Sequence, residues 1–140
     1  MPGTVRLFLY GTLQPGAGTV MGDWISARLV RGTGASAPGR LHGLRSKAGW
    51  FPALIPARGF HRVPGTLCEV RLRPGELAVL DRYEGGEYRR VTARVRTASG
   101  ETMVARLYLW RVALPPDAPA IAGGDFLRWL RSGRRRSFGT

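Results

Sequence analysis

Cysteine, histidine and lysine are scarce in this sequence of 140 residues, which contains one cysteine, two histidines and one lysine. The single Cys68 excludes an internal disulfide framework, and a lone thiol in an apolar segment favours a place in the core. His42 and His61 lie far apart, and neither has a Cys, His or carboxylate neighbour at metal-ligand spacing. The sequence therefore predicts neither a metal site nor a Ser-His-Asp relay, and it contains no cofactor motif.

Long apolar segments are absent as well. No run approaches the length of about 18 residues that a transmembrane helix needs, and the apolar run at 7–10 is too short for a signal peptide. Together with the missing disulfides, these absences predict a cytoplasmic protein with no membrane partner. The length predicts a single domain over 1–132, followed by a basic, disordered tail over 133–140.

Positive charge is abundant, with 22 Lys and Arg against 9 Asp and Glu and a formal net charge of +13. The basic residues are scattered along the chain, and the densest cluster comes at the end, at Arg128, Arg131 and Arg134–Arg136. Lys47 is the only lysine, and this preference for arginine, with abundant Gly, Ala and Pro, favours a compositional bias over selection for nucleic acid. Binding of nucleic acid by the arginine-rich tail stays open as an alternative.

Apolar periodicity and the positions of Gly and Pro predict an alternation of short strands and helices. A buried strand at Val5–Tyr10 and a helix at Pro74–Glu84 are the clearest of these elements. The others are a short helix at Val20–Leu29, strands with bulges near Gly34 and Gly39 within Val30–Leu44, an edge segment at Trp50–Pro56, a strand at Arg62–Arg71, a hairpin of Tyr88–Thr97 and Thr102–Arg111, and a helix at Phe126–Leu130 capped by Asp125. About six strands with a marked central helix predict an α+β domain whose sheet curls toward a barrel.

An apolar strand that ends at Tyr10 and turns at Gly11 leaves the backbone N–H groups of Gly11, Thr12 and Leu13 free to converge. Clustered N–H groups of this kind form a concavity that binds anions, and glycine permits the close approach of a ligand. The segment lacks the Gly-Lys-Ser/Thr sequence of a phosphate-binding P-loop. Taken alone, the pattern favours an ordinary turn after a buried strand.

Glu84 is the last residue of the predicted central helix and is followed by two glycines. A carboxylate at the core boundary and at the negative end of a helix dipole loses solvent, so its pKa rises and it becomes a stronger base near neutral pH. Taken alone, a solvated glutamate at a helix end is the commoner explanation. Asp81 and Glu87 compete for the same role, but Asp81 can pair with Arg89 or Arg90, and Glu87 lies in an exposed position beyond the glycines.

Six sequence blocks occur in a characteristic order from about residue 5 to residue 129. They are Leu-Tyr-Gly-Thr-Leu at 9–13, Phe-Pro-Ala-Leu at 51–54, Val-Pro-Gly-Thr-Leu at 63–67, Leu-Asp-Arg-Tyr-Glu-Gly-Gly-Glu-Tyr-Arg-Arg at 80–90, Ala-Arg-Leu-Tyr-Leu-Trp at 105–110 and Gly-Gly-Asp-Phe at 123–126. No single block is diagnostic, but their ordered combination resembles the gamma-glutamylcyclotransferase-like family.

This resemblance implies a small mixed β-barrel of about six strands flanked by helices, with a cavity lined by the Tyr-Gly-x-Leu loop. It implies an enzyme that cyclises a small-molecule gamma-glutamyl amide to 5-oxoproline and releases the amine without a metal or cofactor. By motif, Glu84 is the general acid/base and Tyr88 lines the pocket. The glutamyl end of the substrate is then held by the loop residues Tyr10, Gly11, Thr12 and Leu13.

Two further functions are kept as alternatives. One is a non-catalytic module of the same fold that binds a small carboxylate ligand, and the other is a nucleic-acid binder driven by the arginines. The family motif does not account for the charge of +13 or for the run Arg134–Arg136. The sequence leaves open the identity of the released amine and the oligomeric state.

Overall fold

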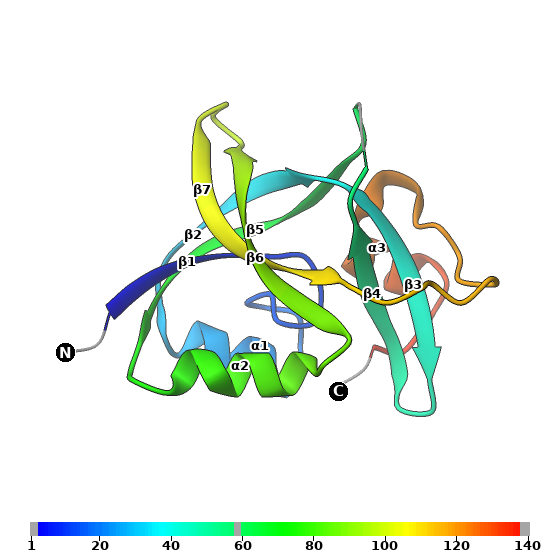
Figure 1. The fold of residues 1–140 in the computed structure, drawn as a ribbon, viewed down its shortest axis with the longest axis horizontal. Coiled ribbons are helices and arrows are strands. Elements are labelled where there is room, and N and C mark those ends of the chain that lie inside the picture. Colours follow the sequence, from blue (N-terminus) through cyan, green and yellow to red (C-terminus); the bar gives the residue numbers. More distant parts are fainter. Residues whose placement is uncertain (1–2, 58–59, 138–140) are drawn as a thin grey trace.

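This computed structural model describes residues 3–57 and 60–137. They contain seven strands, three α-helices and one short 3₁₀ helix, joined by loops. Strands β1, β5, β2, β6 and β7 form a closed barrel in that order, and β3 and β4 form a separate antiparallel sheet. Figure 1 shows α1 and α2 below the barrel, and α3 at the end of the molecule that carries β3 and β4. The elements are β1 (Gly3–Leu9), α1 (Val20–Ser26), β2 (Leu29–Pro38), β3 (Arg40–Ser46), β4 (Gly49–Ile55), β5 (Arg62–Leu72), α2 (Glu76–Glu84), β6 (Tyr88–Thr97), β7 (Thr102–Trp110), η1 (Ala122–Gly124) and α3 (Phe126–Ser132).

The apolar run of β1 is buried on both faces of the strand. Phe8 belongs to the core cluster that β6 and β7 share, whereas Leu7 and Leu9 belong to a second cluster with Ile25 of α1 and Leu80 of α2. Successive residues of a strand point to opposite faces, so a strand with apolar material on both sides has a continuous apolar sequence. This double burial explains why β1 lacks the alternation that β6 and β7 show.

The antiparallel pairing of β1 with β5 sets the position of α2. Gly3 pairs with Leu72 and Leu9 pairs with Thr66, so β5 ends beside the start of β1. Only three residues separate β5 from α2, and α2 then runs back in the direction of β1 (Figure 1). Its nine residues cover about 13 Å. The end of α2, at Glu84, is thereby carried toward the end of the barrel where β1 stops.

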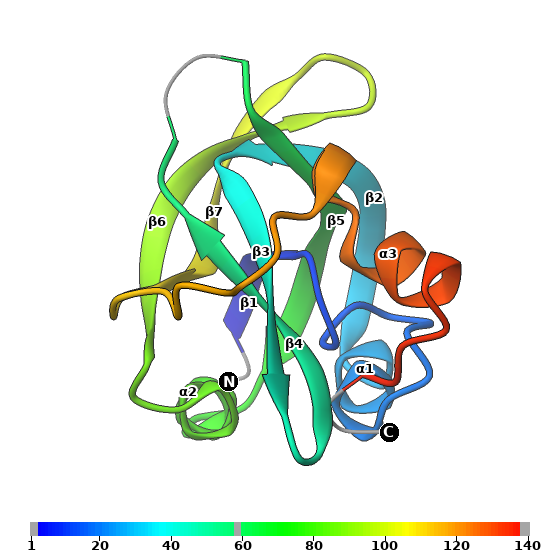
Figure 2. The ribbon, with the colours of Figure 1, turned by 90° about the vertical axis from the view of Figure 1, so that its right-hand side faces the viewer.

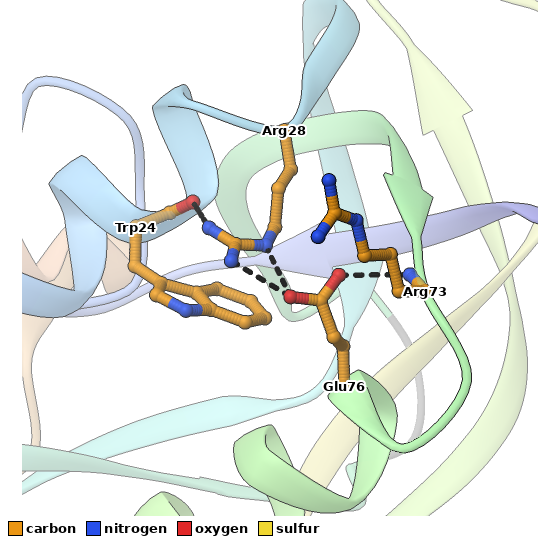
Figure 3. Close-up of polar contacts among 4 residues, drawn as sticks. All are labelled: Trp24, Arg28, Arg73 and Glu76. Atoms are coloured by element: carbon orange, nitrogen blue, oxygen red, sulfur yellow. Dashed lines mark hydrogen bonds and ion pairs between the residues drawn. The ribbon is translucent and has the colours of Figure 1, made fainter. Parts of the chain in front are cut away.

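An ion pair holds the start of α2 against the chain that follows α1 (Figure 3). Arg28 donates to Glu76 Oε2 from Nε at 2.9 Å and from Nη2 at 2.7 Å, and its guanidinium lies 3.7 Å from the ring centroid of Trp24. The other carboxylate oxygen of Glu76 accepts the backbone N–H of Arg73 at 2.8 Å. These hydrogen bonds, the one from Arg28 above all, lower the pKa of Glu76. The negative charge of Glu76 therefore lies in the first turn of α2, where it interacts favourably with the helix dipole. The N-cap residue, Gly75, provides no side-chain acceptor there.

The predicted α+β barrel is confirmed, with differences in the number and bounds of its elements. The β6–β7 hairpin and α3 with its Asp125 cap agree with the prediction, whereas α1 ends earlier, at Ser26, and α2 begins later, at Glu76. The predicted bulges near Gly34 and Gly39 are wrong. The chain divides at Gly39 (φ 147°) into β2 of the barrel and β3 of the small sheet, and the register shift of β2 falls near its start. The predicted edge segment is strand β4, paired with β3.

The start of the C-terminal tail contacts α3 and the small sheet in this structure, and the disorder that the sequence predicted over 133–140 stays a prediction. After α3 the chain runs back toward the β3–β4 hairpin (Figure 2), where Ser137 forms a parallel bridge with Trp50 of β4. The guanidinium of Arg135 lies 3.9 Å from the ring centroid of Trp129 and donates to the Trp129 carbonyl at 2.9 Å. Contacts with two tryptophans, which composition does not reveal, hold this part of the tail. The last three residues lie outside the described part of the chain.

Within the described residues, no helix has both the length and the apolar composition that crossing a bilayer would require.

Replacing Arg135 with alanine should lower the free energy of unfolding by about 1 kcal/mol, because the change removes one hydrogen bond and one cation–π contact. Arg131→Ala is the matched control, since Arg131 is an exposed arginine of α3, and its effect should stay within about 0.5 kcal/mol. Urea-induced unfolding followed by circular dichroism measures both variants. Equal stability of the two would contradict an ordered tail.

Candidate active site

A cavity of about 290 Å³ lies where the loop after β1 meets the end of α2. Segments that are far apart in the sequence contribute to it, namely the β1 loop, the β3–β4 hairpin, α2, and residues of β6 and β7. All six residues that the sequence nominated line this cavity: Tyr10, Gly11, Thr12, Leu13, Glu84 and Tyr88. Further lining residues, which the sequence did not nominate, include Ser46, Phe51, Pro52, Tyr83, Glu87 and Tyr108.

The loop after β1 is held through its carbonyl groups. The Thr12 carbonyl accepts the hydroxyl of Thr19, the N-cap residue of α1, and the Gly11 carbonyl accepts the N–H of Gln14 at 3.2 Å. Among the described residues, no acceptor is assigned to the backbone N–H groups of Gly11, Thr12 and Leu13. These donors therefore remain available to an anionic group in the cavity.

Gly11 is required by close packing against β4. A Cβ atom at this position would lie 2.5 Å from Cγ of Pro52, which is well inside the contact distance of two carbon atoms. The sequence attributed this glycine to the turn and to ligand approach. The structure adds that any side chain here would push the loop away from the β3–β4 hairpin.

Glu84 occupies the end of α2, which stops at Gly85, a residue with a left-handed φ of 88°. Leu80, one turn earlier, is fully buried and holds this end of the helix against the core. Burial, and then the neighbouring charge of Asp81, raise the pKa of Glu84 from 4.5 to about 8. Glu84 is not completely buried, and it is one of the residues that line the cavity. Its carboxyl group can therefore take up and release a proton near neutral pH.

All four tyrosines of the sequence line the cavity. Tyr10 donates its hydroxyl to the carbonyl of Tyr108, and Tyr88 donates to a carbonyl of β4 at 2.5 Å. The hydroxyl oxygens of Tyr83 and Thr12 lie 3.4 Å apart and join α2 to the β1 loop. Burial raises the pKa of all four phenols, so they are neutral hydrogen-bonding groups at neutral pH.

The two other carboxylates considered for the catalytic role have different surroundings. Asp81 accepts a hydrogen bond from Arg90 at 2.5 Å and another from the hydroxyl of Tyr108 at 2.8 Å. Arg90 is one of the two partners that the sequence suggested. Glu87 lines the cavity but is exposed. Among the three, Glu84 is the carboxyl group that combines burial with access to the cavity.

The histidines and the cysteine lie outside this site. Nδ1 of His42 lies 3.1 Å from the Ala118 carbonyl, and Nε2 of His61 lies 3.1 Å from a guanidinium nitrogen of Arg40. Cys68 is buried, and burial raises the pKa of its thiol to about 12. Across residues 3–57 and 60–137, no three His, Cys, Asp or Glu side chains are grouped so that they could hold a metal ion.

Tyr83 and Tyr108 were missed by the sequence analysis. A signal for both was present, because the chain has only four tyrosines and each falls within one of the ordered blocks, at 9–13, 80–90 and 105–110. Because every tyrosine lies within a motif, each hydroxyl is expected to have a specific hydrogen-bond partner. A phenylalanine at the same position could not form that hydrogen bond.

A carboxyl group with a raised pKa lowers the stability of the folded protein as the pH rises from about 4.5 to about 8. Glu84→Gln should therefore stabilise the protein at pH 9 by roughly 2–4 kcal/mol and have little effect at pH 4. Glu101→Gln, in the exposed β6–β7 turn, should show no such dependence. Unfolding measured at several pH values tests this, and a stability difference that does not grow with pH would contradict the burial of the charge.

Several solved structures resemble this fold. An Arabidopsis thaliana protein solved in solution is 25% identical over 96% of this chain and 77% of its own, with a TM-score of 0.61. An AIG2-like protein from Mus musculus is 18% identical over 88% of both chains, with a TM-score of 0.65. A structure described as a gamma-glutamyl cyclotransferase is 18% identical over 84% of this chain and 70% of its own, with a TM-score of 0.57.

The search of curated protein sequences gave no match. The model of a protein family described as gamma-glutamyl cyclotransferase, AIG2-like, matches residues 7–128, which include every nominated site residue and all six ordered blocks. The resemblance stated from the sequence is thereby confirmed. This match covers most of the chain, and the protein belongs to the AIG2-like gamma-glutamyl cyclotransferase family.

Proposed function

We propose that this protein is a cyclotransferase that converts a gamma-glutamyl amide into 5-oxoproline and a free amine. Membership of the family supports a cyclotransferase-like enzyme at the level of the family. The observation that carries the specific proposal is the shared cavity, in which Glu84, with its raised pKa, and the β1 loop line the same space. One feature provides a proton carrier and the other provides donors for an anion.

The reaction needs little chemistry from the protein, because the substrate carries its own nucleophile. The α-amine attacks the γ-carbonyl carbon, a C–N bond forms within a five-membered ring, and the original amide C–N bond then breaks. Effective molarities of order 10⁵ M or more are typical of such well-oriented intramolecular reactions. The protein must therefore fold the glutamyl group, remove one proton and return one proton.

Glu84 is assigned both proton steps. As a carboxylate it accepts a proton from the attacking α-amine, and as a carboxylic acid it gives that proton to the departing nitrogen. Proton transfer in both directions is efficient when the pKa of the group lies near the working pH, and the pKa of about 8 meets this condition. The number of protons is conserved over the cycle, and no water enters the products.

The loop residues Gly11, Thr12 and Leu13 are assigned the substrate's α-carboxylate, because their N–H groups have no assigned acceptor among the described residues. The neutral hydroxyls of Tyr10 and Tyr88 are engaged with carbonyl groups, so these side chains shape the wall rather than carry charge. With its α-carboxylate at the loop, a glutamyl group of five carbons can fold within a cavity of about 290 Å³.

Glu84→Gln should lower the rate of 5-oxoproline release by about a thousandfold or more, since an amide lacks the acid and base functions. The product is measured by chromatography after incubation with a panel of gamma-glutamyl amides. Glu101→Gln is the matched control for the lost charge and should retain full activity. Activity in Glu84→Gln would remove this residue from the mechanism, and saturable binding without turnover in the unmodified protein would favour a ligand-binding module instead.

The pH dependence offers an independent test. The free enzyme needs Glu84 as a carboxylate to accept the first proton, so kcat/KM should rise with pH and level off above about 8. Because the charge of Asp81 contributes to the raised pKa, Asp81→Asn should move this inflection to lower pH. A profile that is flat from pH 6 to pH 9 would contradict the assignment of Glu84.

A further inference from the structure

The β3–β4 hairpin forms part of the cavity wall. Phe51 and Pro52 of β4 line the cavity, and the Pro52 carbonyl accepts the hydroxyl of Tyr88 at 2.5 Å. The ring of Pro52 also packs against Gly11, since a Cβ atom on this glycine would lie 2.5 Å from its Cγ. Among the described residues, neither strand of the hairpin pairs with a strand of the barrel, because β3 and β4 form a sheet of their own. The position of this wall is therefore set by the groups that pack against the hairpin.

Trp129 of α3 packs against the face of the hairpin that carries Pro52. Gly43 and Pro52 are direct partners across the β3–β4 pair, so both lie on the same face of the small sheet. A Cβ atom on Gly43 would lie 2.5 Å from Cη2 of Trp129, so the indole ring occupies the space that any side chain here would need. The ring of Trp50, on the same face, meets Trp129 edge-on, with centroids 5.0 Å apart and an interplanar angle of 89°. Trp129 thus fills the space beside the proline that contacts the β1 loop.

The segment after α3 holds the hairpin nearer its tip, where both ribbon views place the end of the described chain (Figure 1, Figure 2). The carbonyl of Arg136 accepts the N–H of Trp50 at 2.8 Å, and Ser137 forms a parallel bridge with the same residue. The guanidinium of Arg135 lies 3.9 Å from the ring centroid of Trp129. All of these supporting residues lie beyond 7–128, the part of the chain that the family model matches.

We propose that Trp129 is a positioning residue of the active site, which together with the segment after α3 holds the β3–β4 hairpin against the β1 loop and so sets the width of the cavity. This inference rests on the cyclotransferase activity proposed above. Trp129 is not one of the described residues that line the cavity, and it acts through Gly43 and Pro52. When the hairpin moves away, the β1 loop loses its contact with Pro52, so substrate binding weakens. Glu84 is held by the packing of α2 and keeps its surroundings.

Trp129→Leu should raise KM for gamma-glutamyl n-butylamide about tenfold, because displaced binding groups lose affinity. Its kcat should change by less than about threefold, and the pH inflection of kcat/KM should stay where it is in the wild-type protein. Trp129→Phe keeps a ring on Gly43 and should restore most of the affinity. Arg131→Ala, on the exposed side of α3, is the control and should have wild-type kinetics. Wild-type KM in Trp129→Leu, or a fall in kcat alone, would overturn the positioning role.

Gly43→Ala perturbs the same contact by a single methyl group. The added carbon meets the Trp129 ring, so this variant alone should raise KM by about fivefold. In the Trp129→Leu background the methyl group has more room, and its additional effect on KM should be less than about twofold. An equal effect of Gly43→Ala in both backgrounds would show that the two positions act independently and would overturn the proposal.

Amide hydrogen exchange, followed by mass spectrometry, tests the positioning without any assay of activity. Trp129→Leu should speed exchange in peptides of the β3–β4 hairpin by a larger factor than in peptides of the β6–β7 hairpin, which report loss of overall stability. Equal factors in both hairpins would overturn the positioning role and leave the cyclotransferase activity standing. Absence of turnover in the wild-type protein, with exchange enhanced selectively in the β3–β4 hairpin, would overturn the activity and leave the mechanical role of Trp129 standing.

Discussion

The antiparallel pairing of β1 with β5, followed by a connection of only three residues into α2, is the constraint on which the site depends. It makes α2 run in the same direction as β1, so the ends of the two elements meet at one end of the barrel. The ion pair of Arg28 with Glu76 holds the other end of the helix, and the burial of Leu80 holds its middle. The loop after β1 and the end of α2, about seventy residues apart in the sequence, thus become neighbours in the fold.

This arrangement places Glu84 where its ionisation opposes folding. The buried end of α2 removes solvent from the carboxyl group, and Asp81 adds like charge without being free itself, because it is bound to Arg90 and Tyr108. The fold therefore tolerates an unfavourable charge at one position, which is common where a group must exchange protons. The surplus of arginine does not relieve this, since the described lining of the cavity contains none.

Much of the fold was predictable because its signals are local. The continuous apolar run of β1, the glycines after α2 and the Asp125 cap each determine an element through nearby residues. The position of β3 was not predictable, because Gly39 moves the chain from the barrel to a second sheet, a change that alternation alone does not reveal. The contact of Ser137 with Trp50 was not predictable for a similar reason, because it joins segments distant in the sequence. The contact of Arg135 with Trp129 is local, six residues along the chain, and the arginines taken alone do not reveal it.

All four tyrosines lie around one cavity, so the tyrosine spectra of the protein report on the surroundings of that cavity. Phenol absorption and near-ultraviolet circular dichroism respond to the polarity and hydrogen bonding of the ring, and here the entire tyrosine signal comes from the cavity wall. Tyr88 also contacts the indole of Trp110, with ring centroids 5.2 Å apart, which permits energy transfer from the wall to a buried fluorophore. A ligand that changes the hydrogen bonding or polarity around these rings is therefore expected to change the spectra of the unlabelled protein.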